Sequence, residues 1–190
     1  MRPQSAKAKG RRLQQYVARR LVAAFPDALV PDDIHSTSMG AGGEDVRMSP
    51  LAQRHIPFII ECKNVEALSL WAAVSQAKAH NRQSSTRTPV VVFTRNHEQT
   101  WICIPREKCD ALPDDCTVYD YTNKRACVWR LIAEHQNTTK RPCERKPFAL
   151  HLSHVDHGAY VVCEFTMWVA SIVTRNYYSY VSSSSKPEES

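Results

Sequence analysis

Hydrophobic side chains recur at helical spacing near the start of the chain. They lie three or four positions apart and stop just before Pro26. This spacing predicts an amphipathic helix that opens near Gly10 and ends at the proline. Residues 1–10 are polar and basic, and we expect a flexible arm there. The apolar stripe of the helix consists of Leu13, Tyr16, Val17, Leu21 and Phe25.

Shorter hydrophobic runs further along the chain are typical of strands. In 57–63, apolar residues alternate with a second set that includes Glu61 and Lys63, so we expect those two on one face of a strand. A helix is expected next at 68–80. Further strands are expected at 45–48, 89–94 and 101–104, the last two joined as a hairpin. This order of elements predicts an α/β fold with a mixed central sheet flanked by helices.

The second half of the chain has a weaker pattern. Residues 11–135 are expected to form the core domain, with a helix at 126–132, and the polar stretch 136–147 is expected to be a linker. Strand character in 148–181, strongest at 160–165 and 167–173, predicts a C-terminal β-rich extension, either an added hairpin or a dimerisation element. The tail 182–190 is rich in serine and is expected to be disordered.

Charge favours a polyanionic partner. The chain has 25 Lys and Arg against 19 Asp and Glu, a formal net charge of +6. Much of the excess falls in the first twenty residues, largely off the apolar stripe of the first helix. It fits a solvated helix face and a phosphate-contacting face equally well. These cations are Lys7, Lys9, Arg11, Arg12, Arg19 and Arg20.

The remaining composition argues for reduced thiols and against a membrane location. Seven cysteines are scattered without the close pairs of a zinc site. No signal peptide is visible, and no apolar run is long enough to span a bilayer. We therefore expect a protein of the cytoplasm, or of the host cytoplasm if a phage encodes it.

Three charged residues carry the most informative pattern. Asp45 is followed sixteen positions later by Glu61, and Lys63 shares a strand face with Glu61. Charges on so apolar a strand are costly to bury without partners. Two carboxylates favour a hard cation such as Mg²⁺ or Mn²⁺. A neighbouring lysine can orient water and stabilise charge on a phosphate, so the set predicts metal-assisted phosphodiester hydrolysis.

A simpler interpretation competes with this one. A Glu-x-Lys triplet occurs by chance in many proteins, where it forms a salt bridge on a surface strand. The context favours catalysis, because an acid lies on the preceding strand, the flanks are apolar, and an amphipathic helix follows.

With these residues in place, the sequence resembles the PD-(D/E)xK nucleases, whose fold is a restriction-endonuclease-like core. The resemblance covers 10–104, about half the chain, and is closest to archaeal-type Holliday junction resolvases and related phage-encoded endonucleases. It implies metal binding by Asp45, Glu61 and the main-chain carbonyl of Cys62, with Lys63 catalytic.

The same resemblance implies further site residues. Ser38, in the loop before Asp45, and Gln76, in the helix after Lys63, match catalytic positions of the resolvases, and Lys9 with Gly10 opens the first helix as it does there. Ser36 in the same loop is expected to contact DNA. So are four cations of the N-terminal region, namely Lys7, Lys9, Arg11 and Arg12.

Three positions depart from the family pattern. Glu44 stands where the motif has proline, a change that the superfamily tolerates. Gln14 replaces the first-helix glutamate of the resolvases, which puts a second tightly bound metal in doubt. His80 replaces a tyrosine and is expected to face solvent.

The function implied is a metal-dependent DNA endonuclease, structure-selective or nicking, acting on branched or duplex DNA and able to work as a homodimer. One alternative is a sequence-specific nuclease of the restriction or homing type. Another is a non-catalytic DNA-binding protein on a nuclease-like core.

Overall fold

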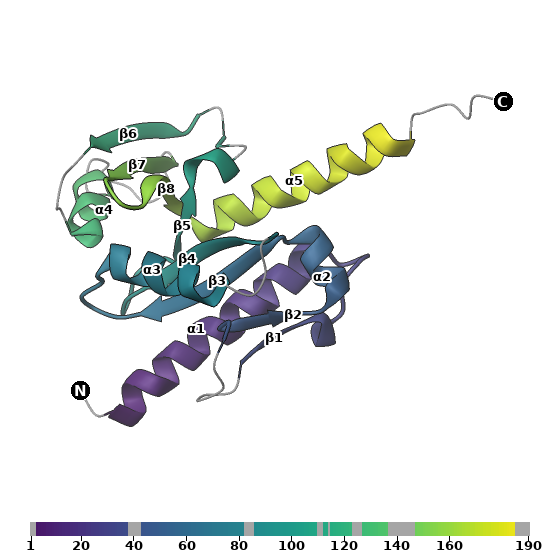
Figure 1. Cartoon of the computed structure of the whole chain (residues 1–190), viewed down its shortest axis with the longest axis horizontal. Coiled ribbons are helices and arrows are strands. Elements are labelled where there is room, and N and C mark those ends of the chain that lie inside the picture. The colour runs from purple at the N-terminus through teal and green to yellow at the C-terminus, as the bar shows by residue number, and fades with distance from the viewer. Residues whose placement is uncertain are drawn as a thin grey trace.

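A mixed six-stranded sheet forms the centre of the molecule and helices cover both of its faces (Figure 1). The strand order is β3-β4-β5-β8-β7-β6. The outer pairs β3–β4 and β6–β7 are parallel, and the three inner pairings are antiparallel. The predicted α/β class is therefore confirmed. This computed structural model describes residues 3–37, 43–81, 86–109, 112–113, 115–122, 127–136 and 147–184.

The elements follow one another in a regular order, with a separate two-stranded ribbon, β1–β2, before the main sheet. Their bounds are α1 Pro3–Ala24, η1 Pro31–Asp33, β1 Ile34–Ser36, β2 Val46–Met48, α2 Pro50–His55, β3 Phe58–Asn64, α3 Leu70–His80, β4 Thr88–Thr94, β5 Trp101–Pro105, η3 Arg106–Lys108, β6 Thr117–Thr122, α4 Val128–Gln136, β7 Phe148–His154, β8 Gly158–Glu164 and α5 Phe165–Ser184.

The first helix begins earlier than its apolar stripe indicates. α1 starts at Pro3, so most of the segment expected to be a flexible arm is helical. Proline is favoured at the first position of a helix, and the alanines and lysines that follow have high helix propensity. Exposed polar turns of this kind leave no hydrophobic periodicity, so pattern alone placed the start at Gly10.

The C-terminal strands complete the central sheet. β7 and β8 form an antiparallel hairpin in which β8 corresponds to the strand expected at 160–165, and β8 also pairs with β5, with Trp101 opposite Glu164. The strand expected at 167–173 is wrong, because this segment is part of α5. Phe165, Trp168 and Ile172 recur at helical spacing and are all buried. From this anchored start, α5 runs outward from the body (Figure 1).

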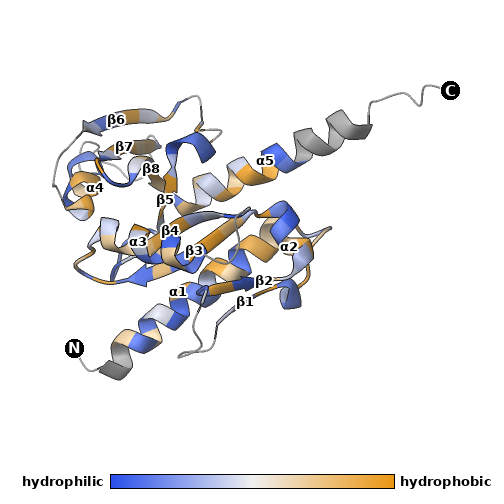
Figure 2. Cartoon of the chain, in the orientation of Figure 1, coloured by the Kyte–Doolittle hydropathy of each residue, from blue (hydrophilic) through white to orange (hydrophobic). Residues whose placement is uncertain are grey.

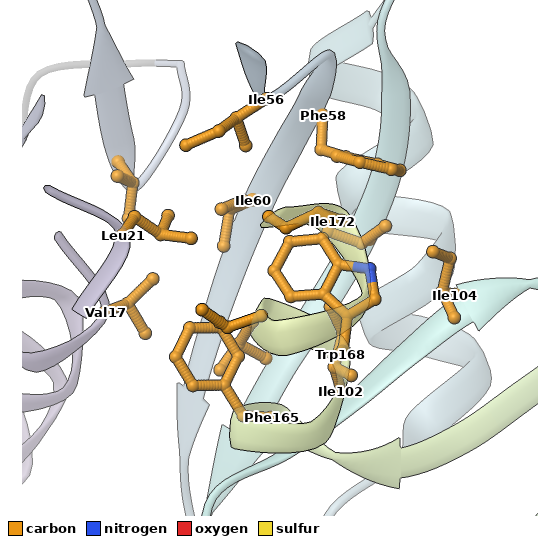
Figure 3. Close-up of a cluster of buried hydrophobic side chains, with 14 of the residues drawn as sticks. Val17, Leu21, Ile56, Phe58, Ile60, Ile102, Ile104, Phe165, Trp168 and Ile172 are labelled. Carbon is orange, nitrogen blue, oxygen red and sulfur yellow. The ribbon is translucent and has the colours of Figure 1, made fainter. Parts of the chain in front are cut away.

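Two hydrophobic cores lie on opposite faces of the sheet. On one face, α1 and α5 cover β3, β4 and β5, and Val17, Ile60 and Trp168 meet there (Figure 3). On the other face, α3 and α4 cover β4, β5, β7 and β8. Figure 2 shows α1 alternating between hydrophilic and hydrophobic colours, as expected for a helix with one face on a core.

Some expectations lie beyond what the structure describes. Of the expected linker 136–147 and the expected disordered tail 182–190, residues 137–146 and 185–190 are outside the described residues, whereas Gln136 ends α4 and residues 182–184 belong to α5, so the first three tail residues are helical and not disordered. The expected helix at 126–132 is α4, which extends to Gln136. Within the described part of the chain, none of the helices combines the length and the hydrophobicity that crossing a bilayer requires.

Candidate active site

The predicted catalytic strand, β3, is one of the two edge strands of the six-stranded sheet. Cys62 belongs to the core under α1, whereas Glu61 and Lys63 lie opposite Val91 and Phe93, which pack against α3. Glu61 and Lys63 therefore share the α3 face, as the alternation predicted. Lys63 Nζ donates to Glu61 Oε1 at 2.6 Å.

Gln76 joins this pair from α3. Its Oε1 accepts a hydrogen bond of 2.8 Å from Lys63 Nζ. The ammonium group is thus held between a carboxylate and an amide oxygen, one from the strand and one from the helix that follows it. A lysine bound at two points has less conformational freedom than a surface lysine, which suits a group that must be positioned for chemistry.

Asp45 reaches the same place from outside the sheet. Asp45 was expected within a strand at 45–48, but it immediately precedes β2, and β2 pairs with β1 and not with β3. The Asp45 carboxylate accepts 2.7 Å hydrogen bonds from the backbone N–H of Cys62 and from Gln14 Nε2. Because the N–H and C=O of one residue point to the same side of a strand, the Cys62 carbonyl faces the same edge.

Glu61 is the most buried charged residue of the cluster, with a side chain only 2% exposed. Burial raises its pKa above the usual value of 4.5, Lys63 opposes that rise, and the nearby Asp45 carboxylate adds to it. Two carboxylates held close together in a poorly hydrated place repel each other. A positive charge between them would relieve that repulsion.

Two oxygen atoms in the cluster are short of partners. Among the described residues, neither Glu61 Oε2 nor Gln14 Oε1 has a hydrogen-bond donor, although both atoms are buried. His80 Nδ1 lies 3.3 Å from Glu61 Oε2 without forming a hydrogen bond. Buried acceptors are rarely left unsatisfied, and Mg²⁺ and Mn²⁺ prefer oxygen ligands. The residues present therefore fit a hard divalent cation.

The possible metal-binding site contains few side-chain carboxylates. Within the described residues, no three His, Cys, Asp or Glu side chains converge as a metal-binding group. The oxygen donors at this edge are the carboxylates of Asp45 and Glu61, the Gln14 amide and the Cys62 carbonyl. Mg²⁺ usually takes one or two protein carboxylates and keeps several waters, so this number is adequate.

Sequence analysis did not predict the roles of His80 and Gln14 in the site. His80 was expected to face solvent, and that expectation is wrong, because its ring faces Glu61 and its side chain is 24% exposed. The signal was available: His80 lies four positions after Gln76, and such residues share one face of a helix. Gln14 was noted only for its missing charge, yet it fixes Asp45 through its Nε2.

The segment that carries Asp45 is fixed by an ion pair. Arg87, just before β4, binds Glu44 through both terminal nitrogens, and Arg87 Nη1 donates to Glu44 Oε2 at 2.8 Å. Their side chains are 10% and 20% exposed. Paired guanidinium and carboxylate groups of this geometry are stronger than single-point contacts. Glu44 therefore holds its neighbour Asp45 in place.

Arg87→Ala is expected to destabilise the protein by about 1–3 kcal/mol, because a partly buried Glu44 carboxylate loses its partner. Adding Glu44→Gln should recover part of that loss, since the unpaired charge is then gone. Urea unfolding measures both. The control is Arg130→Ala, which breaks an exposed pair with Glu134 and should cost under about 1 kcal/mol. Equal losses for Arg87→Ala and Arg130→Ala would contradict this role.

The other predicted site residues do not all join the cluster. Ser38 lies outside the described residues. Ser36 pairs with Val46 in the β1–β2 ribbon and has no hydrogen bond to the described residues of the cluster. The predicted DNA-binding residues lie along α1, where Lys7, Arg11 and Arg12 are exposed and Lys9 is half-buried.

Comparison with known proteins adds no second line of evidence for the function. No family model, curated protein or solved structure matches this chain. The cluster at β3 is therefore interpreted from its own chemistry.

Proposed function

We propose that this protein is a divalent-metal-dependent endonuclease that hydrolyses phosphodiester bonds in DNA. The observation that carries the proposal is the convergence of Asp45, Glu61 and Lys63 at the edge of β3, with Glu61 buried and one of its oxygens without a donor among the described residues. A purely structural salt bridge would not require a second carboxylate beside a buried one. The PD-(D/E)xK core, to which the sequence has a resemblance, uses this combination of groups.

Each residue has a distinct role in the proposal. Asp45, Glu61 and the Cys62 carbonyl would hold Mg²⁺ or Mn²⁺, which supplies positive charge to the phosphate under attack and helps to generate the nucleophile. Lys63 orients the attacking water and stabilises the developing negative charge. Gln76 positions Lys63 from α3, and Gln14 positions Asp45 from α1.

DNA is the proposed substrate because of charge. The net charge of +6 and the exposed cations of α1 favour a polyanion. Selectivity for branched DNA or nicking, and a homodimer that acts on such DNA, rest on the resemblance to junction resolvases. A sequence-specific nuclease would use the same cluster.

A non-catalytic DNA-binding protein is the competing class. Burial, with a smaller contribution from the Asp45 carboxylate, raises the Glu61 pKa and so costs stability at neutral pH. A site that had lost its chemistry would gain stability by losing one of these carboxylates. Their joint presence favours an active enzyme.

Metal binding and cleavage together test the proposal. Calorimetric titration with Mn²⁺ should show binding to the wild-type protein and its loss in Asp45→Ala. Supercoiled plasmid should be nicked or cut with Mg²⁺ or Mn²⁺ and left intact in EDTA. Parallel assays on branched, nicked, single-stranded and linear duplex DNA would identify the preferred substrate. Unchanged metal affinity in Asp45→Ala, or cleavage that persists in EDTA, would exclude the proposed centre.

A further inference from the structure

A groove lies beside the candidate active site, between α1 and the turn that joins β4 to β5. Lys9 and Arg12 line it from α1, Asn96 and His97 line it from the turn, and Asn64 lies between them at the end of β3. Its volume is about 350 Å³, and it is open to solvent along its length. It is therefore a surface channel and not an internal cavity.

The groove carries unpaired positive charge. Among the described residues, neither Lys9 nor Arg12 has an acidic partner, and Arg12 makes only a long 3.4 Å hydrogen bond from Nε to the Ala8 carbonyl. Glu98 is the one acid in the described lining, and both oxygens of its carboxylate already have partners. Its Oε1 accepts from Arg95 at 2.9 Å, and its Oε2 lies 3.5 Å from Gln136 Nε2. The free charge of the groove is therefore that of its two α1 cations.

The turn that forms the opposite wall is held firmly. Arg95 is bonded to Glu98 and its guanidinium lies 4.8 Å from the centre of the Trp129 ring. Thr94 Oγ1 donates to the main-chain carbonyls of the turn, at 3.0 Å for Gln99. His97, at the tip, has a positive φ of 59°. The wall is thus preformed, so a ligand would not have to order it.

The groove lies close to the candidate site but opens on the other face of β3, because Asn64 alternates with Lys63 and shares the α1 face with Cys62. Asn64 is the residue after Lys63, and its Nδ2 donates to the Lys9 carbonyl at 3.3 Å, which links the end of β3 to α1. Successive residues of a strand are about 3.3 Å apart, so the groove begins roughly 10 Å or less from Glu61 along β3. Because β3 is an edge strand, a polymer bound at the cluster would pass around this edge to reach the groove.

We infer that this groove binds a backbone phosphate of the nucleic acid flanking the bond to be cleaved, through Lys9 and Arg12. The inference rests on the proposed function for its orientation, because it places the groove beside the reacting phosphate. It also narrows the predicted DNA-binding set: Lys7 and Arg11 do not line the groove, so Lys9 and Arg12 should dominate.

Removal of two charges at a time tests the groove against the rest of α1. The test pair is Lys9→Ala with Arg12→Ala. The matched control is Arg19→Ala with Arg20→Ala, which removes two exposed arginines of the same helix that lie outside the groove. Affinity for a short labelled DNA duplex is measured in EDTA across a salt series, with circular dichroism to verify folding.

The groove pair should weaken binding at least about tenfold at moderate salt and lower the slope of log affinity against log salt by about 2. The control pair should change affinity less than about threefold. His97→Gly is a second variant, because glycine tolerates the positive φ and only the side chain is lost. It should weaken binding without unfolding the turn.

An equal loss of DNA affinity in the groove pair and in the control pair would overturn the inference in favour of a diffuse contact along α1. Absence of DNA binding by the wild-type protein would also overturn it. Because binding is measured without metal, this result is independent of cleavage. Wild-type protein that binds DNA in the groove but never cuts it with Mg²⁺ or Mn²⁺ would refute the nuclease proposal alone.

Discussion

Lys63→Ala is expected to reduce single-turnover DNA cleavage about 10²–10⁴-fold, the usual cost of losing one general-acid/base or electrostatic group. Lys63 is held at 2.6 Å from Glu61 and 2.8 Å from Gln76, which places its charge at the cluster and not in solvent. DNA affinity should change little, because other phosphate contacts dominate binding. The substitution is therefore expected to lower the rate of cleavage and to leave the affinity for DNA nearly unchanged.

Lys63→Arg should not restore full activity. A guanidinium remains protonated, and its planar fork cannot occupy the position of an ammonium group held between two oxygens. The control is Lys108→Ala, which removes an exposed lysine of η3 and should leave cleavage unchanged. A folded Lys63→Ala protein that cuts at the wild-type rate would eliminate the mechanism and leave only a salt bridge with Glu61.

Glu61→Gln is expected to abolish cleavage, at least about 10³-fold, and at the same time to raise the melting temperature. The glutamine side chain has the same size as glutamate, and its amide oxygen could still accept from Lys63. It carries no charge to repel Asp45 in a buried place. A gain of about 1 kcal/mol would raise the melting temperature of a chain of this size by about 2–4 °C. Stability and activity should thus move in opposite directions.

The pH dependence of this gain follows from the raised Glu61 pKa. A carboxyl group with a higher pKa in the folded protein than in the unfolded chain costs stability once pH exceeds the folded value. As pH falls, the cost shrinks through the folded pKa and is gone below about the unfolded value of 4.5. The advantage of Glu61→Gln should therefore be full at pH 8 and vanish in acid.

Thermal melts in EDTA and in Mg²⁺ measure these effects. Magnesium should stabilise the wild-type protein and not the Glu61→Gln variant, because only the former keeps both carboxylates. The matched control is Glu134→Gln, at an exposed side chain paired with Arg130, which should change stability by less than about 0.5 kcal/mol. A Glu61→Gln protein that is less stable than wild type at pH 8 would show that the Lys63 ion pair outweighs the burial of charge.

Local pattern was sufficient for much of the fold. The alternation in β3 correctly placed Glu61 and Lys63 on one face, and the periodicity of α3 and the hairpin of β4 and β5 were visible directly. The sequence did not reveal which strands of the sheet the C-terminal strands pair with. β8 joins β5 from far along the chain, and no local feature of either strand specifies that partner. The branched and aromatic composition of 167–173 also outweighed its helical spacing in the prediction.

Sequence analysis likewise predicted some residues of the candidate site and missed the contacts that support them. Asp45, Glu61, Lys63 and Gln76 were predicted, and the structure brings them together, because each sits at a fixed place on a short local segment. The supporting contacts depend on tertiary placement. Arg87 could not be matched to Glu44, nor Gln14 to Asp45, until α1 and the β1–β2 ribbon were set beside β3. The nuclease function itself stays a prediction.

The pairing of β8 with β5 has a consequence for how the protein is made. Every described residue of the catalytic cluster has been synthesised by His80, but the sheet that supports it is complete only when Glu164 has joined Trp101. At the ~5–20 residues per second of translation, the ribosome needs several seconds to add the intervening chain. From the time Pro105 is added until β8 pairs with it, β5 has an open hydrogen-bonding edge, and the core face that Trp168 will cover is bare. The emerging chain thus holds all the side chains of the candidate site before it has a stable scaffold, which makes the nascent protein prone to strand-mediated association and, under the proposed function, would delay DNA cleavage until α5 has folded.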